Sequence, residues 1–189
     1  MAKTSIKTLK MDFHTHPIEA LQVKMGIKGV GNINKEVAAM IVKAVKEAGL
    51  NGIAITEHGN FNRSWVTALE ILDHFQKENL VILPGEELDY QGQQFLRIYI
   101  PEYYRRRMPF FKNKEWFLIF THPGFYNPLD ISQFEGINYD AVEEKSVHGD
   151  FPSAGQIALA KNIPTTRSSD AHLLEDIGKY YTELEFGTK

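Results

Sequence analysis

Leu9-Lys10-Met11-Asp12-Phe13-His14-Thr15-His16 is the stretch of sequence that decides the fold. It ends in two histidines at positions i and i+2, which point to the same face when the backbone is extended. A similar segment lies near the end of the chain, Ser168-Ser169-Asp170-Ala171-His172. Imidazole and carboxylate groups are ligands for divalent metal ions. Both ends of the chain therefore carry the pattern of a metal site.

Three further segments between these two also end an apolar run in a histidine or a glutamate. They are Ile53-Ala54-Ile55-Thr56-Glu57-His58, Val81-Ile82-Leu83-Pro84-Gly85-Glu86-Glu87 and Phe117-Leu118-Ile119-Phe120-Thr121-His122. In sheets and barrels of alternating strands and helices, ligands gather at the C-terminal ends of the strands. The five segments together therefore predict one polar cluster at the C-terminal edge of a single sheet or barrel.

The spacing of apolar residues predicts strands that alternate with helices. We expect strands over residues 9–15, 52–56, 80–84, 94–100, 116–120, 139–142, 164–168 and 180–186. We expect helices over residues 34–48, 64–77, 129–134 and 153–161, with Asn34 and Ser64 as N-caps, Gly49 as a stop and a turn at Gly92. This alternation favours an α/β fold with a mostly parallel sheet, closed into a small barrel.

The composition sets limits on the class of protein. The chain has 189 residues, 43% of them hydrophobic, which predicts one domain over residues 1–189. A net charge of −3 gives no strong attraction to nucleic acid or membranes. The absence of cysteine excludes thiolate metal sites and a cysteine nucleophile. Neither a membrane span nor a signal peptide is visible, so we expect a cytoplasmic protein; the sequence leaves the oligomeric state open.

The five segments resemble, in order, the motifs of the PHP (polymerase and histidinol phosphatase) family. The matching residues are Asp12-x-His14-x-His16, Thr56-Glu57-His58, Pro84-Gly85-Glu86-Glu87, Thr121-His122-Pro123-Gly124 and Ser169-Asp170-Ala171-His172. The resemblance runs from Asp12 to about Leu184 and selects Glu87 over Glu86. It implies a distorted (β/α)7 TIM-like barrel, with two or three divalent metal ions at the C-terminal ends of the strands and phosphoester hydrolysis as the activity.

Three positions depart from the family's pattern. Glu57 stands where the second motif normally has an aspartate, and the stretch 17–24 lacks the histidine that often follows the first motif. Phe95-Leu96-Arg97 stands where many members have a histidine. The last two departures concern the third metal site.

The resemblance implies six histidines and two acids as metal ligands. They are His14, His16, His58, Glu87, His122, His148, Asp170 and His172. Two metals acting together need a bridging carboxylate, for which Glu87 is the candidate. We expect one metal to be held by His14, His16 and Asp170, and a second by Glu87, His122 and His148. The ligands accept zinc, manganese and iron alike.

Several polar residues have roles that the sequence leaves open. His58 and His172 either hold a third metal or act on the substrate, for example as proton donors. Asp12 is expected to orient a ligand histidine through a hydrogen bond. Of the consecutive pair Glu143 and Glu144, one can face the metals. His74 lies within an expected helix, where we expect it to be solvated.

Substrate phosphate needs cations, and three are candidates. Arg97 and Arg167 lie in or beside expected strands, and Lys24 lies in the loop after the first motif. A guanidinium suits bidentate binding of phosphate. The basic run Arg105–Arg107, flanked by aromatic residues, could grip single-stranded nucleic acid, although a solvated loop is favoured.

These observations together predict a metal-dependent phosphoesterase. The expected substrate is a small phosphomonoester or a nucleotide, attacked by a hydroxide that bridges two metals beside Glu87, with His172 or His58 protonating the leaving oxygen. One alternative is amide hydrolysis by the same metals, which is favoured if Arg97 and Arg167 do not converge on them. A second alternative is a non-catalytic, metal-stabilised interaction module.

Overall fold

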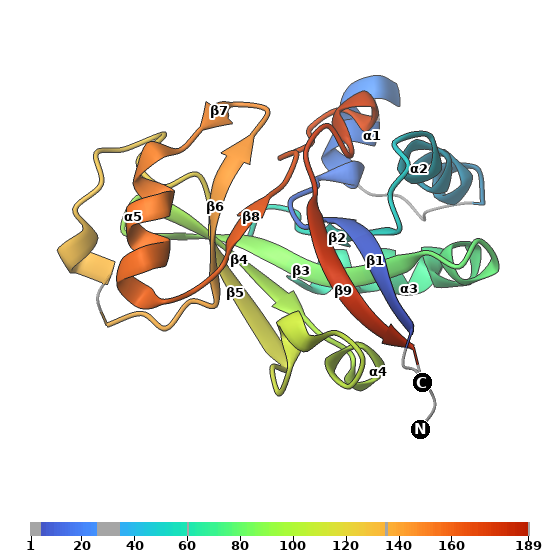
Figure 1. The fold of residues 1–189 in the computed structure, drawn as a ribbon. Helices are drawn as coiled ribbons and strands as arrows, with labels where there is room; N and C mark the ends of the chain where they lie inside the picture. The colour runs from blue at the N-terminus through green and yellow to red at the C-terminus, as the bar shows by residue number, and fades with distance from the viewer. Residues whose placement is uncertain (1–4, 26–34, 60, 135, 189) are drawn as a thin grey trace.

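The computed structural model describes residues 5–25, 35–59, 61–134 and 136–188, and within them the strands form one curled sheet (Figure 1). The strands are β1 (Ser5–Asp12), β2 (Gly52–Ile55), β3 (Val81–Tyr90), β4 (Gln93–Tyr99), β5 (Trp116–Phe120), β6 (Ala141–Ser146), β7 (Gly149–Asp150), β8 (Thr165–Arg167) and β9 (Thr182–Thr188). Their order is β7-β6-β5-β4-β3-β2-β1-β9, and β8 pairs with β6 beside this path. The expected α/β class is therefore confirmed.

The sheet is mixed, and this corrects the expectation of a mostly parallel barrel. β1, β2 and β3 are parallel to one another, as are β5, β6 and β8. β4 runs antiparallel to both β3 and β5, and β9 runs antiparallel to β1. The reason at β3 and β4 is the tight turn at Gln91 and Gly92, whose φ angles are 52° and 76°. A two-residue turn reverses the chain and leaves no room for a crossover helix.

Five α-helices and three short 3₁₀ helices accompany the sheet in the described residues. They are α1 (Pro17–Met25), α2 (Lys35–Glu47), α3 (Phe61–Lys77), α4 (Glu102–Arg105), α5 (Pro152–Lys161), η1 (Pro109–Phe111), η2 (Ile131–Phe134) and η3 (Leu174–Asp176). Helices α2 and α3 lie near β2 and β3, and α5 lies beside β6 at the other end of the sheet (Figure 1). None of the helices in the described ranges is both long and apolar enough to span a bilayer.

Most of the expected helices are present, with shifted ends. Helix α3 begins at Phe61, so Ser64 lies buried inside the helix and the expectation that it caps the helix is wrong. Gly49 follows α2 with a φ of 68°, as a helix stop requires. Asn34 lies outside the described residues. Helix α1 and the short α4 were not expected from the sequence.

Three apolar clusters fix the strands. One joins α2 and α3 to β2 through residues such as Ile41, Ile53 and Phe75. The second fills the curled sheet with Leu96 and Ile98 of β4 and further apolar residues. The third packs α5 onto β4, β5 and β6. Full burial of one such side chain contributes roughly 1.5–3 kcal/mol, so these clusters hold the strand ends, and the polar residues on them, in fixed relative positions.

Candidate metal centre

Glu87 lies at the centre of a group of histidines that come from different strands. The Nε2 atoms of four histidines lie within 3.5 Å of its carboxylate oxygens: His122 at 3.1 Å, His58 at 3.1 Å, His14 at 3.3 Å and His16 at 3.5 Å. His14 and His16 follow β1, His58 follows β2 and His122 follows β5, whereas Glu87 lies within β3. The curled sheet thus brings the ends of three strands to a carboxylate on a fourth.

Asp170 is a second carboxylate with the same kind of surroundings. Its oxygens lie 2.9 Å from Nε2 of His148, 3.3 Å from Nε2 of both His14 and His16, 3.5 Å from Nδ1 of His172 and 4.0 Å from Nε2 of His122. His14 and His16 lie between the two carboxylates. The structure therefore brings together all eight residues that the sequence singled out as ligands.

The donor atoms of this cluster fit divalent metal ions. Four of these atoms are buried without a hydrogen-bond partner: Nε2 of His14, both ring nitrogens of His16 and Oδ1 of Asp170. The Asp170 oxygen lies 3.3 Å from Nε2 of each histidine. Buried polar atoms without a partner are rare, and an ion is one of the explanations for them. In two buried sets, the ligand atoms all lie within 4.8 Å of one another: His14, His16 and Glu87, and His14, His122 and Glu143.

A third set of ligand atoms lies at the rim of the cluster. It consists of His16, Glu19, His58 and His172, again with all atoms within 4.8 Å of one another. Glu19 lies 3.0 Å from Nδ1 of His58 and 3.8 Å from Nε2 of His172. The side chains of His58 and His172 are 43% and 42% exposed, so this part of the cluster is open to solvent.

Sequence reasoning missed Glu19 because it sought a histidine in the stretch 17–24. The usable signal is a carboxylate in the first turn of a helix that begins directly after the first motif. Oε1 of Glu57 accepts a hydrogen bond of 2.7 Å from the backbone N–H of Ile18. The residue that departs from the second motif thus holds the turn that carries Glu19.

Glu143 is the inward-facing member of the pair within β6. Its Oε1 lies 3.3 Å from Nδ1 of His14, and its Oε2 accepts a hydrogen bond of 3.1 Å from the backbone N–H of His122. A carboxylate on the second ring nitrogen fixes the orientation and tautomer of a ligand histidine. This role was expected of Asp12, but Glu143 has it.

Asp12 instead accepts hydrogen bonds from the backbone. Its Oδ1 accepts from the N–H groups of Ser169, at 2.9 Å, and of His14, at 3.3 Å, and its Oδ2 accepts from Gly178 at 2.9 Å. Burial raises the pKa of Asp12 to about 6, against these hydrogen bonds and that of the Ser169 hydroxyl, which lower it. Asp12 therefore joins the backbone of the first motif to that of the last motif and does not contact a histidine ring.

Two candidate ligands have an unusual backbone. His122 has a φ of 25° and Asp170 a φ of 54°. Residues other than glycine reach this region at a cost of roughly 1–3 kcal/mol, and such residues cluster at functional sites. At both residues the strained backbone directs the side chain into the cluster.

The ionisation of the cluster follows from its charges. Burial opposes the ionisation of Glu87, but the positive charge of His14 and the hydrogen bond from His122 outweigh it, so the pKa of Glu87 lies well below its ordinary value. Burial lowers the pKa of His16 to about 4, which favours the neutral ring that a metal ion needs. Hydrogen bonds to Glu19 and Glu87 raise the pKa of His58 to about 10.

The two arginines expected to bind phosphate lie away from the cluster. Nε of Arg97 donates to Glu86 at 2.8 Å, and its guanidinium lies 5.1 Å from the ring of Trp116. Arg97 pairs across the strands with Glu86, while Leu96 pairs with Glu87. Since neighbouring residues of a strand point to opposite faces, Arg97 points away from Glu87. Arg167 donates to Glu144 at 2.6 Å and is 60% exposed.

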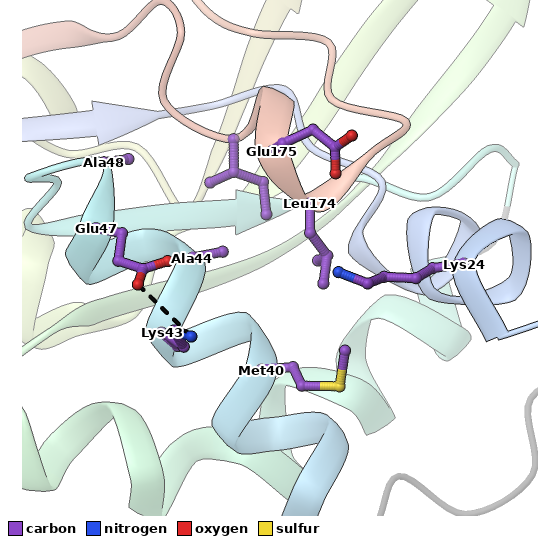
Figure 2. Close-up of a pocket in the computed structure, with 9 residues that line it drawn as sticks. Lys24, Met40, Lys43, Ala44, Glu47, Ala48, Leu174 and Glu175 are labelled. Carbon is purple, nitrogen blue, oxygen red and sulfur yellow. Dashed lines mark ion pairs between the residues drawn. The ribbon is translucent and has the colours of Figure 1, made fainter.

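Lys24 also lies elsewhere. It lines a separate cavity of about 440 Å³ with residues of α2 and η3, among them Met40, Lys43 and Leu174 (Figure 2). None of the eight predicted ligands lines this cavity. The structure therefore does not bring these three cations to the predicted ligands: Arg97 and Arg167 pair with Glu86 and Glu144, and Lys24 lies on α1 beside the separate cavity.

Arg106 and Arg107 of the basic run interact with residues of their own helical segment. Arg106 pairs with Glu102 one helical turn away, and the guanidinium of Arg107 lies 4.0 Å from the ring centre of Tyr103. His74 lies on α3, outside the cluster, and is half-buried.

Comparison with known proteins agrees with this fold. The profile of a family described as PHP-associated matches residues 152–189. A two-domain protein from Bacteroides vulgatus, containing a predicted PHP-like metal-dependent phosphoesterase, matches with a TM-score of 0.60 and 19% identity over 89% of this chain and 53% of its own. This chain thus spans about half of that protein. A proposed metal-dependent phosphoesterase from Bifidobacterium adolescentis matches with a TM-score of 0.62 and 14% identity, over 91% of this chain and 92% of its own. No curated protein sequence matches the chain.

The fold and the cluster define an α/β chain of the PHP-like fold with a candidate centre for divalent metal ions. The profile match at the C-terminal end, together with the shared fold, supports membership of the PHP family. The exact (β/α)7 arrangement is not confirmed, because the sheet contains the antiparallel strands β4 and β9.

Proposed function

We propose that this chain is a metal-dependent phosphoesterase that hydrolyses a small phosphomonoester or a nucleotide. The observation that carries the proposal is the position of Glu87, a single carboxylate within 3.5 Å of four histidine nitrogens. Such a residue suits the bridge between two metals that in-line displacement at phosphorus uses. The two solved structures of the same fold are named for the same activity, which supports the reaction class.

In this proposal, the buried part of the cluster holds two ions and the rim holds a third. The two buried positions would be formed by His14, His16, Glu87, His122, His148 and Asp170. The rim position would be formed by Glu19, His58 and His172, beside His16. Bound zinc, manganese or iron would supply the Lewis acidity that activates water and offsets charge on a phosphoryl group.

Residues around the ligands hold them in position. Glu143 orients the ring of His14, and Asp12 fixes the backbone on either side of the centre. His58 and His172 are exposed, so a substrate that enters from the rim meets them first. If the rim holds no ion, these two histidines are placed to donate a proton to the leaving oxygen.

The test is hydrolysis by protein purified without chelator and supplied with Mn²⁺ or Zn²⁺. We expect turnover of p-nitrophenyl phosphate, its loss in His14→Ala, and full activity in His74→Ala, the histidine outside the cluster. Failure to hydrolyse any member of a broad panel of phosphate esters would contradict the reaction class. Unchanged activity of His14→Ala would exclude His14 from the centre.

A second candidate function is amide hydrolysis by the same centre. The observation that favours it is the position of Arg97 and Arg167, which pair with Glu86 and Glu144 instead of pointing at the centre. An enzyme for a dianionic phosphate gains from a guanidinium at the site, whereas an amide needs none. The same preparations assayed on a panel of N-acylated amino acids and cyclic amides separate the two reactions.

A further inference from the structure

The loop that follows His122 carries two aromatic side chains that lie exposed beside the candidate metal centre. Phe125 is 45% exposed and Tyr126 is 55% exposed. Elsewhere in the chain, most phenylalanines with a described side chain are buried in the core clusters. Two neighbouring exposed aromatic residues at the edge of a site therefore need an explanation other than core packing.

Both rings contact histidines of the centre. The ring of Tyr126 lies 5.0 Å from that of His122 at an angle of 89°, and the ring of Phe125 lies 5.0 Å from that of His148 at 32°. The two aromatic rings are 4.8 Å apart and nearly perpendicular, at 81°. A molecule bound at the second predicted metal position would thus meet these two aromatic side chains.

The loop is held in place by hydrogen bonds to the hairpin of β3 and β4 and to α5. Gly124, with a φ of 82°, donates to the side chain of Gln93 at 3.1 Å, and Gln93 donates to the carbonyl of Asn127 at 3.2 Å. Asn127 donates to the carbonyl of Gly92 at 2.6 Å, and Ser153 donates to that of Pro123 at 3.0 Å. A loop ordered before binding loses little entropy when a ligand arrives.

We infer that Phe125 and Tyr126 bind a flat aromatic ring of the substrate, such as a nucleobase or an aryl leaving group; this rests on the proposed hydrolase function. Aromatic side chains stack on flat rings and tolerate differences between them. Arg97 and Arg167, which were expected to bind the substrate, pair with Glu86 and Glu144 instead. The surface formed by Phe125 and Tyr126 therefore favours an aromatic group of the substrate over an additional anionic group. Phe125 and Tyr126 would therefore determine specificity without taking part in the reaction.

The experiment compares AMP with ribose 5-phosphate, which share the phosphate and the sugar and differ in the base. Binding of each probe to the Mn²⁺-loaded protein is measured by calorimetry. We expect AMP to bind about tenfold more tightly than ribose 5-phosphate, as loss or gain of one stacked base implies. Phe125→Ala/Tyr126→Ala should remove this preference, and Tyr103→Ala, an exposed aromatic residue on α4, should keep it.

Phe125→Leu/Tyr126→Leu retains apolar side chains and tests whether flat rings are needed; we expect the preference to fall here too. Equal affinity of the two probes in the unmodified protein, no binding of either, or a preference kept in both double variants would overturn the inference. Hydrolysis of the same esters separates the two proposals. Turnover without a preference for AMP removes the aromatic site and leaves the phosphoesterase. A preference in binding without turnover of any phosphate ester supports the aromatic site and removes the phosphoesterase.

Discussion

Asp12 and Ser169 are joined by two hydrogen bonds, although 157 residues separate them in the chain. The backbone N–H and the hydroxyl of Ser169 each donate to one oxygen of the fully buried Asp12 carboxylate. His14 follows Asp12 by two residues, and Asp170 follows Ser169 directly. One buried carboxylate thus sets the distance between the first and the last pair of candidate ligands.

Asp12→Ala should lower both stability and metal binding. The substitution leaves several buried donors without an acceptor, at a cost of about 3 kcal/mol. For a chain of this length, a loss of 1 kcal/mol lowers Tm by roughly 2–4 °C, so we expect a decrease of about 6–12 °C in thermal unfolding. Asp130→Ala, an exposed aspartate, is the control. A Tm within 2 °C of the parent protein would disprove the structural role of Asp12.

Glu143→Gln should weaken metal binding, whereas Glu144→Gln should not. Glu143 is buried against the ring of His14, and Glu144 faces the other way and pairs with Arg167. Loss of a carboxylate that orients a ligand histidine costs about 10–100-fold in affinity. Competition with a fluorescent chelator measures both variants. Equal affinities would show that the contact with His14 contributes nothing to the centre.

Glu19→Gln should remove one metal ion and leave the others. Glu19 contacts His58 and His172 at the rim, and it belongs to neither of the buried sets of ligand atoms. Elemental analysis per mole of protein gives the stoichiometry, with Glu36→Gln on α2 as the control. If the metal content stays the same while activity falls, then the rim acts on the substrate and not on a third metal.

Arg97→Ala and Arg167→Ala should leave kcat/KM within about twofold of the parent value. Arg97 is 46% exposed and Arg167 is 60% exposed, and each has its own carboxylate partner away from the centre. The pair of Arg167 and Glu144 is partly exposed on both sides, so we expect a change of only about 0–1 kcal/mol in the stability of Arg167→Ala. Arg97→Ala leaves the buried carboxylate of Glu86 without its cation and should lower the stability more. A tenfold loss of kcat/KM in either variant would place that arginine on the substrate, in conflict with the structure.

Local sequence patterns predicted most of the strands, and the resemblance to the PHP motifs selected the eight candidate ligands. The apolar runs before His14, His58 and His122 form strands because their side chains fill the core clusters. The turn at Gly92 was also predicted correctly, since a hairpin turn needs residues that accept a positive φ. The ligands' roles stay predictions until metal is measured.

Helix α1 and its Glu19 were missed, and the reason is local. The helix begins at Pro17, directly after the first motif, and its apolar residues show little helical periodicity. The direction of Arg97 depended on pairing with a neighbouring strand: its partner Glu86 shows that it lies on the face opposite Glu87. Arg97 and Glu86 are only 11 positions apart, but the register of a hairpin depends on how its two strands pair and pack, and the pattern of one strand does not specify it.

The sequence by itself determined the chemistry of this protein: imidazole and carboxylate groups, no thiol, and strands that each deliver one or two such groups to a C-terminal end. Only the tertiary structure decided which groups meet. Glu143 rather than Asp12 reached the ring of His14, and both arginines turned away. The physical reason is that residue type and local periodicity are properties of neighbours in the chain, whereas contacts between different strands depend on how the strands pair and how the curled sheet packs on its apolar clusters.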